Sequence, residues 1–445
     1  MPEKKFPIFI KSLDYARTLD ANDPLKEYRN KFHIPQKEGK DLIYFCGNSL
    51  GLQPKSVRDY IEQELKDWET FGVEGHLHAK NPWLYYHHFL EEQTARLVGA
   101  KPIEVVVMNT LTVNLNLLLI SFYRPTKTRY KIMMEYMAFP SDQYAVENQI
   151  KFHGFDPQDA IIELAPLTNG ADGSEYTIRT EYILQKIEQH KDELALIMIG
   201  GVNYYTGQLF EMEKITAYAG KCSPEIMVGY DLAHAAGNAE LHLHDWNIDF
   251  ATWCSYKYLN SGPGGTSGVF IHEKHKNNTT LPRLSGWWGN EETTRFKMQK
   301  GFYPQPGAAG WQMSNAQILP MAAHRASLEI FDAVGMKKLN EKSFLLTGYL
   351  EYLLNSPPEG SKRSDFKIIT PTDPNQRGCQ LSIIMNPGSP DSYRGVGDGK
   401  KAFDVLTANG IIADWREPDV VRVAPVPLYN SFEDVWQFAE IFHGV

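Results

Sequence analysis

The stretch DFATWCSYKY (residues 249–258) decides the fold when it is read together with IMVGYDLAH (residues 226–234). Each stretch begins as an apolar, strand-like run and continues to a side chain that can take part in catalysis. That side chain is Asp231 in the earlier stretch and Lys257 in the later one. Parallel strands place their carboxyl ends at one edge of a sheet, where ligands bind. We therefore expect Asp231 and Lys257 to face one pocket.

Around these two stretches, strand-like and helical patterns alternate from about residue 85 to residue 275. Predicted strands cover residues 105–108, 131–135, 161–164, 194–199, 226–230, 250–254 and 268–272, and predicted helices cover residues 111–122, 141–152, 175–190 and 213–222. Short apolar strands separated by helices indicate an α/β layer with a mostly parallel, seven-stranded sheet.

The remaining parts of the chain predict a second, smaller domain. Beyond about residue 315 the pattern changes to long helices (316–334 and 336–354), followed by strands (367–370, 379–384 and 420–424). Residues 1–40 are polar, and a helix is expected to open at Pro54. We predict three parts: an N-terminal arm and helix that pack with the small domain (1–75), a large α/β domain (76–315) and a C-terminal small α+β domain (316–445).

Composition narrows the class of protein. The chain has 445 residues, and its net charge of −9 disfavours non-specific binding to nucleic acid. No apolar stretch approaches the roughly 20 residues of a membrane-spanning helix. The first residues lack the pattern of a signal peptide. The four cysteines are scattered without a C-x-x-C pair, which disfavours a zinc site or a disulfide framework and favours a reducing, cytoplasmic location.

A lysine and an acid at the ends of neighbouring strands suit an enzyme that holds pyridoxal phosphate. The amine of Lys257 would form a Schiff base with the aldehyde, and Asp231 would keep the pyridine nitrogen protonated. Taken alone, Lys257 is more simply a surface lysine and Asp231 a helix N-cap. The combination is more specific, because Asp-x-x-His is followed by the lysine one αβ unit later.

Two strand-to-helix junctions offer further contacts for such a cofactor. FPSD (residues 139–142) supplies an aromatic ring that could stack on it. MNTLT (residues 108–112) offers backbone N–H groups and the hydroxyl of Thr112, which could cradle a phosphate at a helix N-terminus. Helix capping alone explains each junction more simply when it is taken in isolation.

Three other patterns are rejected. The glycine-rich loop at residues 262–268 has the spacing G-x-G-x-x-x-G and precedes a strand, unlike a dinucleotide-binding loop. The stretch GNSLG (residues 47–51) has the spacing G-x-S-x-G, but the predicted helix opens only at Pro54 and not directly after the serine, so a serine hydrolase is not predicted. The histidine pairs at residues 76/78, 87/88 and 242/244 lack the i, i+4 spacing of a metalloprotease, so no metal site is predicted.

With these residues in place, the chain resembles the kynureninase family of pyridoxal-phosphate enzymes, which have the aspartate-aminotransferase fold (fold type I). The resemblance covers nearly the whole chain. It is carried by FCGNSLG (45–51), MNTLTVNL (108–115), FPSDQY (139–144), YYTGQ (204–208), DLAHA (231–235), WCSYKYLN (253–260), GWWG (286–289) and RVAPVPLYN (422–430).

The resemblance implies a role for each matching position. Lys257 would be the Schiff-base lysine, Asp231 would pair with the pyridine nitrogen, and Tyr256 would assist proton transfer or bind the phosphate. Further cofactor contacts would come from Leu111, Thr112, Phe139, Pro140, Ser141, Asp142, His234, Trp287 and Asn315. Substrate contacts would come from Ser49, His76, Asn315 and Arg422, with Arg422 clamping the α-carboxylate. Trp287 and Asn315 would reach the site from the second subunit of a homodimer.

The implied activity is hydrolysis of L-kynurenine or 3-hydroxy-L-kynurenine to anthranilate or 3-hydroxyanthranilate and L-alanine. It would serve tryptophan catabolism or de novo NAD synthesis. A cysteine desulfurase or selenocysteine lyase would need a reactive cysteine on a mobile loop, whereas Cys379 lies in a strand-like stretch. A non-catalytic binding or regulatory protein of this fold would be expected to lack Lys257 or Asp231. Gly200 stands where some relatives have a serine that touches the cofactor. Trp288 stands at a position that is often phenylalanine.

Overall fold

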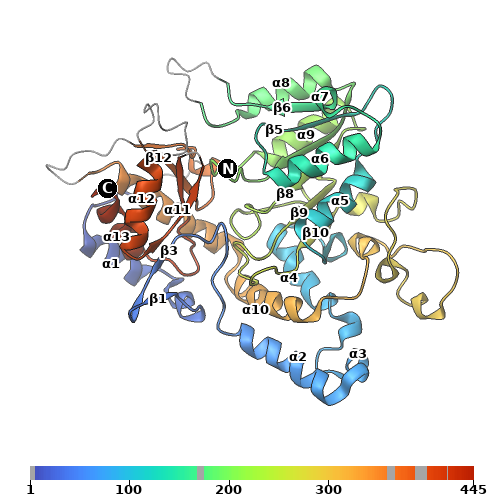
Figure 1. The fold of residues 1–445 in the computed structure, drawn as a ribbon, viewed down its shortest axis with the longest axis horizontal. Helices are drawn as coiled ribbons and strands as arrows, with labels where there is room; N and C mark the ends of the chain where they lie inside the picture. The colour runs from blue at the N-terminus through green and yellow to red at the C-terminus, as the bar shows by residue number, and fades with distance from the viewer. Residues whose placement is uncertain (1–5, 168–174, 358–365, 386–397, 418, 445) are drawn as a thin grey trace.

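A seven-stranded sheet forms the centre of the larger part of the molecule (Figure 1). The computed structural model describes residues 6–167, 175–357, 366–385, 398–417 and 419–444. In spatial order the strands are β4 (Val105–Val107), β10 (Gly268–Ile271), β9 (Phe250–Trp253), β8 (Met227–Asp231), β7 (Leu194–Gly200), β5 (Lys131–Glu135) and β6 (Ile161–Leu164). β10 is antiparallel to both its neighbours, and the other pairings are parallel. The predicted mostly parallel α/β sheet is confirmed, and every strand end lies within one residue of its predicted position.

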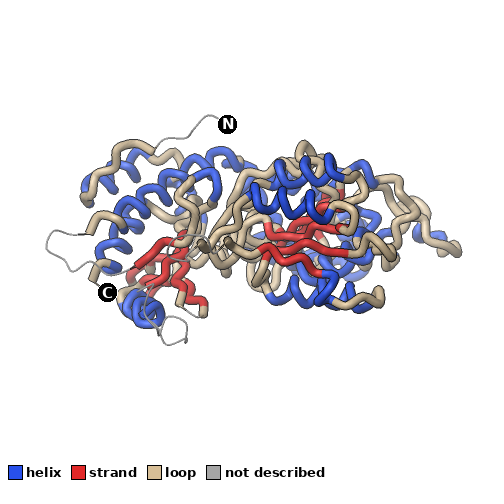
Figure 2. Tube along the Cα trace, turned by 90° about the horizontal axis from the view of Figure 1, so that it is seen from above, coloured by secondary structure: helices blue, strands red, loops and turns tan. Residues whose placement is uncertain are grey.

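Both faces of this sheet are covered by helices, as Figure 2 shows. Successive side chains of a strand point to opposite faces, and β4 illustrates the result. Val105 and Val107 pack into one apolar cluster, while Val106 packs into another. The first cluster includes side chains of α4 (His88–Val98), α8 (Thr180–His190) and α9 (Met212–Cys222), and the second includes side chains of α5 (Leu111–Phe122) and α6 (Pro140–Phe152). Burial on both faces explains why the strands read as continuous apolar runs.

A smaller antiparallel sheet stands beside the first one (Figure 2). Its strands, in spatial order, are β11 (Phe366–Ile368), β12 (Leu381–Met385), β15 (Val420–Val423) and β14 (Asp414–Arg416), and α11 (Met336–Leu354), α12 (Asp398–Ala408) and α13 (Phe432–Phe442) pack around them. The N-terminal segment belongs to the same core, because α1 (Leu13–Asn22) packs on α13 and β3 (Ile43–Tyr44) pairs with β13 (Ile411–Ile412).

Two further helices, α2 (Val57–Phe71) and α10 (Ile318–Val334), lie below the larger sheet in the view of Figure 1. α2 packs on α10, which also packs on α4. The shorter elements are α3 (Gly75–His78), α7 (Pro157–Ala160), β1 (Gln36–Lys37) and β2 (Lys40–Asp41). Domain boundaries at residues 75 and 315 remain a prediction.

The sequence pattern misjudged several helix ends. The helix expected from Pro54 begins at Val57, and the helix expected over residues 175–190 begins at Thr180. α12, α13, β13 and β14 were not predicted. In the described part of the chain, no helix combines the length and apolar character needed to cross a membrane.

Candidate active site

A cavity of about 180 Å³ opens at the carboxyl ends of the parallel strands, where the sequence placed Asp231 and Lys257. Many of its walls come from strand-to-helix junctions, since Glu135, Gly200 and Asp231 are the last residues of β5, β7 and β8. The cavity is lined by Leu111, Thr112, Glu135, Phe139, Ser141, Asp142, Gly200, Val202, Tyr204, Asp231, Ala233, His234, Cys254, Tyr256 and Lys257.

Lys257 lies in the turn that follows β9, with its amine inside this cavity. Its Nζ is 3.0 Å from Nε2 of His234, 5.8 Å from the centroid of the Phe139 ring and 6.0 Å from that of Tyr256. Burial, reinforced by the charge of Lys257, holds the pKa of His234 well below its usual range. A neutral His234 can accept a hydrogen bond at Nε2 from the amine of Lys257. Its Nδ1 is buried and has no hydrogen-bond partner among the described residues.

Two buried carboxyl groups, Asp231 and Asp142, face the amine across the cavity. Burial, followed by the charge of Asp231, raises the pKa of Asp142 well above its usual range. Burial also raises the pKa of Asp231, while hydrogen bonds from Asp142 and from the N–H of Ala233 (2.7 Å) oppose that rise. Asp142 is therefore the more readily protonated member of the pair, and its hydroxyl donates a hydrogen bond to the carboxylate of Asp231.

Glu135 is a third acid in the cavity, and the sequence analysis did not select it. Its carboxylate accepts hydrogen bonds from the N–H of Gly200 at 3.0 and 3.2 Å. Burial raises the pKa of Glu135 to about 7. A Cβ at position 200 would lie 2.9 Å from Oε1 of Glu135, which explains why glycine suits that position here. The signal was present in the sequence, because Glu135 ends a predicted strand as Asp231 does.

The start of α5 supplies an anion site at the cavity wall. Its N-cap residue, Thr110, makes no side-chain capping bond, which leaves the first N–H groups of the helix free of that partner. Leu111 and Thr112 stand at this end and line the cavity. Ser141 lies in the first turn of α6, and its hydroxyl is 3.3 Å from Asp142. Pro140 begins α6 and does not line the cavity.

These features fit pyridoxal phosphate. A buried carboxylate such as that of Asp231 is stabilised by a cationic N–H donor, and a protonated pyridine nitrogen is such a donor. The N-terminus of α5, with its uncapped N–H groups, can bind an anion, and the phosphate group of the cofactor is an anion. The amine of Lys257 lines the same cavity, 5.8 Å from the centroid of the Phe139 ring.

Arg422 and Ser49 lie outside the cavity wall, on the side of the small domain. The guanidinium of Arg422 is 1% exposed, and it donates to the carbonyl oxygen of Tyr204 (2.6 Å) and to Asp414 (2.5 Å). Because Tyr204 lines the cavity, Arg422 is one residue removed from it. Ser49 is half-buried in the turn after β3, and its N–H bonds to the carbonyl oxygen of Cys46.

Trp287, Asn315 and His76 are not brought to the cavity of their own chain. They line a separate, apolar pocket of about 460 Å³ together with Val73, Glu74, Leu77, Leu84, Trp288 and Phe296. Trp287 is 45% exposed and Phe296 is 55% exposed. Within one chain these three residues therefore stand apart from Lys257, and their roles at the site stay a prediction.

The fold and the cavity define a class-V aminotransferase type of pyridoxal-phosphate enzyme, and the comparisons agree. The profile of aminotransferase class V matches residues 43–377, and the profile of the kynureninase C-terminal domain matches residues 339–442. The chain belongs to the kynureninase family and is therefore a pyridoxal-phosphate-dependent enzyme.

Curated relatives support this assignment over nearly the full length. The chain is 53% identical to a kynureninase of Flavobacterium psychrophilum over 434 residues, covering 98% of each chain. It is 53% identical to a kynureninase of Myxococcus xanthus, again covering 98% of each, and 49% identical to one of Coccidioides immitis, covering 96% of this chain and 93% of the relative.

Solved structures share the fold at low sequence identity. A cysteine desulfurase from Thermococcus onnurineus superposes with a TM-score of 0.70 at 17% identity, covering 100% of this chain and 99% of the other. The cystine C–S lyase C-DES superposes with a TM-score of 0.71 at 16% identity, covering 90% and 97%.

Proposed function

We propose that this enzyme hydrolyses the Cβ–Cγ bond of L-kynurenine or 3-hydroxy-L-kynurenine, releasing anthranilate or 3-hydroxyanthranilate and L-alanine. The family assignment supports the reaction class. The observation that carries the proposal is the grouping of Lys257, His234 and the Asp142–Asp231 pair around one cavity.

The chemistry divides between the cofactor and the protein side chains. When bound, pyridoxal phosphate supplies an electron sink for the substrate Cα. Lys257 would hold the cofactor through Nζ and would afterwards move the Cα proton, with neutral His234 as the hydrogen-bond acceptor that orients its amine. Asp231 and Asp142 keep a proton at the ring nitrogen. Phe139 would stack on the ring, and the remaining contacts would come from Leu111, Thr112 and Ser141, while Pro140 begins α6 outside the cavity wall.

Tyr256 is the proposed proton donor beside Lys257. Burial raises its pKa above the usual value for tyrosine, so the hydroxyl stays protonated at neutral pH and is available as a donor. Its ring lines the same cavity as the amine of Lys257. Both a proton-relay role and a phosphate-binding role require that hydroxyl.

Arg422 is the proposed clamp for the substrate α-carboxylate. Asp414 and the carbonyl oxygen of Tyr204 hold its guanidinium in a fixed orientation, and its buried Nε has no hydrogen-bond partner in the described part of the chain. A planar fork in a fixed orientation suits bidentate recognition of a carboxylate. Ser49 and His76 are proposed to contact the aromatic end of the substrate.

A homodimer with shared sites accounts for the position of Trp287, Asn315 and His76. Exposed aromatic side chains such as Trp287 and Phe296, gathered around a pocket, are typical of a surface that binds another protein. We propose that this surface of one subunit completes the Lys257 cavity of the other. We also propose a cytoplasmic location and a place in tryptophan catabolism or NAD synthesis.

A desulfurase-type reaction is disfavoured by the cysteines, all four of which lie in the described residues. Cys379 is 1% exposed, and burial raises the pKa of its thiol to about 12. Its backbone N–H is also bonded to Asn238. A neutral, buried thiol held in place is a poor nucleophile.

A spectral titration of the purified enzyme tests the proposal. Adding L-kynurenine or 3-hydroxy-L-kynurenine should change the cofactor absorption and release an aromatic amine, whereas L-cysteine should release no sulfide. Sulfide release with no response to either kynurenine would reject the proposed reaction in favour of desulfuration.

A further inference from the structure

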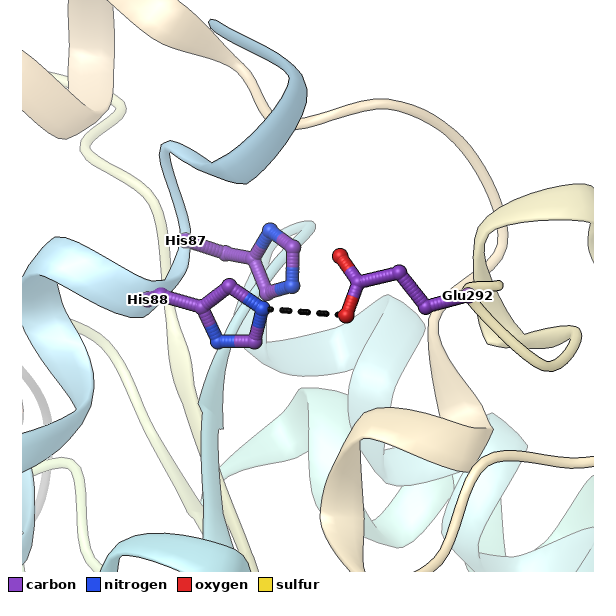
Figure 3. Close-up of side chains that lie close together, drawn as sticks. All are labelled: His87, His88 and Glu292. Atoms are coloured by element: carbon purple, nitrogen blue, oxygen red, sulfur yellow. Dashed lines mark hydrogen bonds and ion pairs between the residues drawn. The ribbon is translucent and has the colours of Figure 1, made fainter. Parts of the chain in front are cut away.

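Three potential metal ligands, drawn in Figure 3, lie close together outside the lining of the Lys257 cavity. His87 precedes α4, His88 begins it, and Glu292 lies on the segment that follows the short helix Trp287–Gly289. One ligand atom from each residue lies within 4.8 Å of the other two. None of the three lines the cavity of Lys257. The group His87, His88 and Glu292 is called the α4 cluster below.

Two members of the α4 cluster have polar atoms that are buried and unbonded. His87 is 0% exposed, and neither of its ring nitrogens has a hydrogen-bond partner among the described residues. Oε1 of Glu292 is also buried without a hydrogen-bond partner there. Buried polar groups are nearly always bonded to something. In Figure 3 one ring nitrogen of His87 points toward the space between His88 and Glu292.

The third member, His88, is oriented as a metal ligand usually is. Its Nδ1 is 2.7 Å from Oε1 of Glu91, and its Nε2 is 3.4 Å from Oε2 of Glu292. Metal-binding histidines commonly donate their other ring nitrogen to a carboxylate. A separation of about 3.4 Å is also what two ligands of a tetrahedral zinc ion have, given metal–ligand bonds of roughly 2.0–2.1 Å. Without a metal, the two carboxylates would account for the orientation of His88, but the ring nitrogens of His87, whose ring centroid lies 4.1 Å from that of His88, would have no hydrogen-bond partner in the described part of the chain.

A second cluster of potential ligands in the same chain differs from the α4 cluster in its hydrogen bonding. Glu104, His244 and His272 also bring potential ligands together. Here, however, Glu104 accepts from the N–H groups of Lys101 and Glu273 at 2.8 Å and bonds to His244 at 2.9 Å. His272 bonds to the carbonyl oxygen of His244 and to the N–H of Lys274. Hydrogen bonds within the protein satisfy that cluster, so it calls for no ion.

From this contrast we propose that the α4 cluster binds one divalent transition-metal ion of the zinc type. Two imidazoles and one carboxylate, with a further position left for water, suit such an ion. Arg295 limits the affinity, because its guanidinium lies 3.9 Å from Oε1 of Glu292 and adds a positive charge.

The bound ion would join α4 to the segment that carries Trp287. Nε1 of Trp287 donates to the carbonyl oxygen of Arg295 at 3.3 Å, so the turn that carries Glu292 is tied to that aromatic residue. The role is structural. It does not depend on the proposed reaction, because the ion stands outside the cavity.

Zinc binding to the chelator-treated holoenzyme tests the proposal. Isothermal titration with zinc chloride should show one site in the wild type, and Glu292→Gln and His88→Gln should each weaken it by at least about tenfold. Both residues are partly exposed, so the substitutions should leave the fold intact. Glu240→Gln is the matched control, because Glu240 pairs with His242 at 3.6 Å on the surface and should bind zinc as the wild type does.

Two results would overturn the assignment. One is the absence of zinc binding by the wild type. The other is an unchanged isotherm in both cluster variants, which would place the zinc at other histidines or at a cysteine. Anomalous diffraction at the zinc edge from wild-type crystals gives a second reading that needs no variant. A peak between His88 and Glu292 supports the site, and a peak only elsewhere rejects it.

Discussion

Glu135→Gln should make stability of the apoenzyme less dependent on pH. Glu135 binds its proton more tightly in the folded chain, where its pKa is about 7, than in the unfolded chain, where it is near 4.5. Below pH 4.5 the carboxyl is protonated in both states. Between about pH 4.5 and pH 7 the unfolded state gives up this proton while the folded state keeps it, so stability falls as the pH rises, and above pH 7 the loss is complete. At about 1.36 kcal/mol for each pH unit, the loss amounts to about 3 kcal/mol.

Glutamine keeps the acceptor for the N–H of Gly200 but cannot ionise. Urea denaturation of apoenzyme should therefore give similar stabilities for wild type and Glu135→Gln at pH 5, and an advantage for the variant that grows toward about 3 kcal/mol at pH 8. Glu163→Gln is the control, because Glu163 is exposed on the neighbouring strand β6. A difference that stays constant from pH 5 to pH 8 would refute the burial argument for Glu135.

Four further predictions concern the proposed roles. Arg422→Ala should raise KM by about 30-fold or more, the lower end of the 2–5 kcal/mol cost of breaking a buried charge pair, and an unaltered KM would contradict the carboxylate clamp. Tyr256→Phe should lower kcat or cofactor affinity, and unchanged values of both would remove both proposed roles. Lys257→Ala should lack the cofactor absorption band near the visible edge. Subunit exchange between inactive Lys257→Ala dimers and Trp287→Ala dimers should restore activity, because one site of each hybrid dimer then contains both Lys257 and Trp287. Hybrid dimers that stay inactive would exclude shared sites.

The central sheet was predictable because each of its strands has a recognisable pattern in the local sequence. β5 and β6 match their predicted bounds, since strands buried on both faces read as short apolar runs between polar turns. α13 was missed although Ser431 and Asp434 form a capping box at its start. β13 and β14 contain two and three residues, too few for a periodic pattern.

The site was only partly predictable because some of its neighbours are distant in sequence. Asp231 and Lys257 follow recognisable strands, so their approach could be inferred. Glu135 also ends a strand, but no motif distinguished it from an ordinary surface acid. Glu292 lies 204 residues from His88, so no local spacing could reveal the α4 cluster. The motif around Trp287 could be recognised, yet its distance from Lys257 within one chain required the structure.

Product analysis tests the central claim most directly. Purified holoenzyme is incubated with L-kynurenine and, separately, with 3-hydroxy-L-kynurenine, and the aromatic acid and L-alanine are quantified together. We predict equimolar anthranilate or 3-hydroxyanthranilate and L-alanine from at least one substrate, with no product from Lys257→Ala. The two kcat/KM values then decide which substrate is preferred. Absence of both products from the wild type, or equal turnover by Lys257→Ala, would contradict the account.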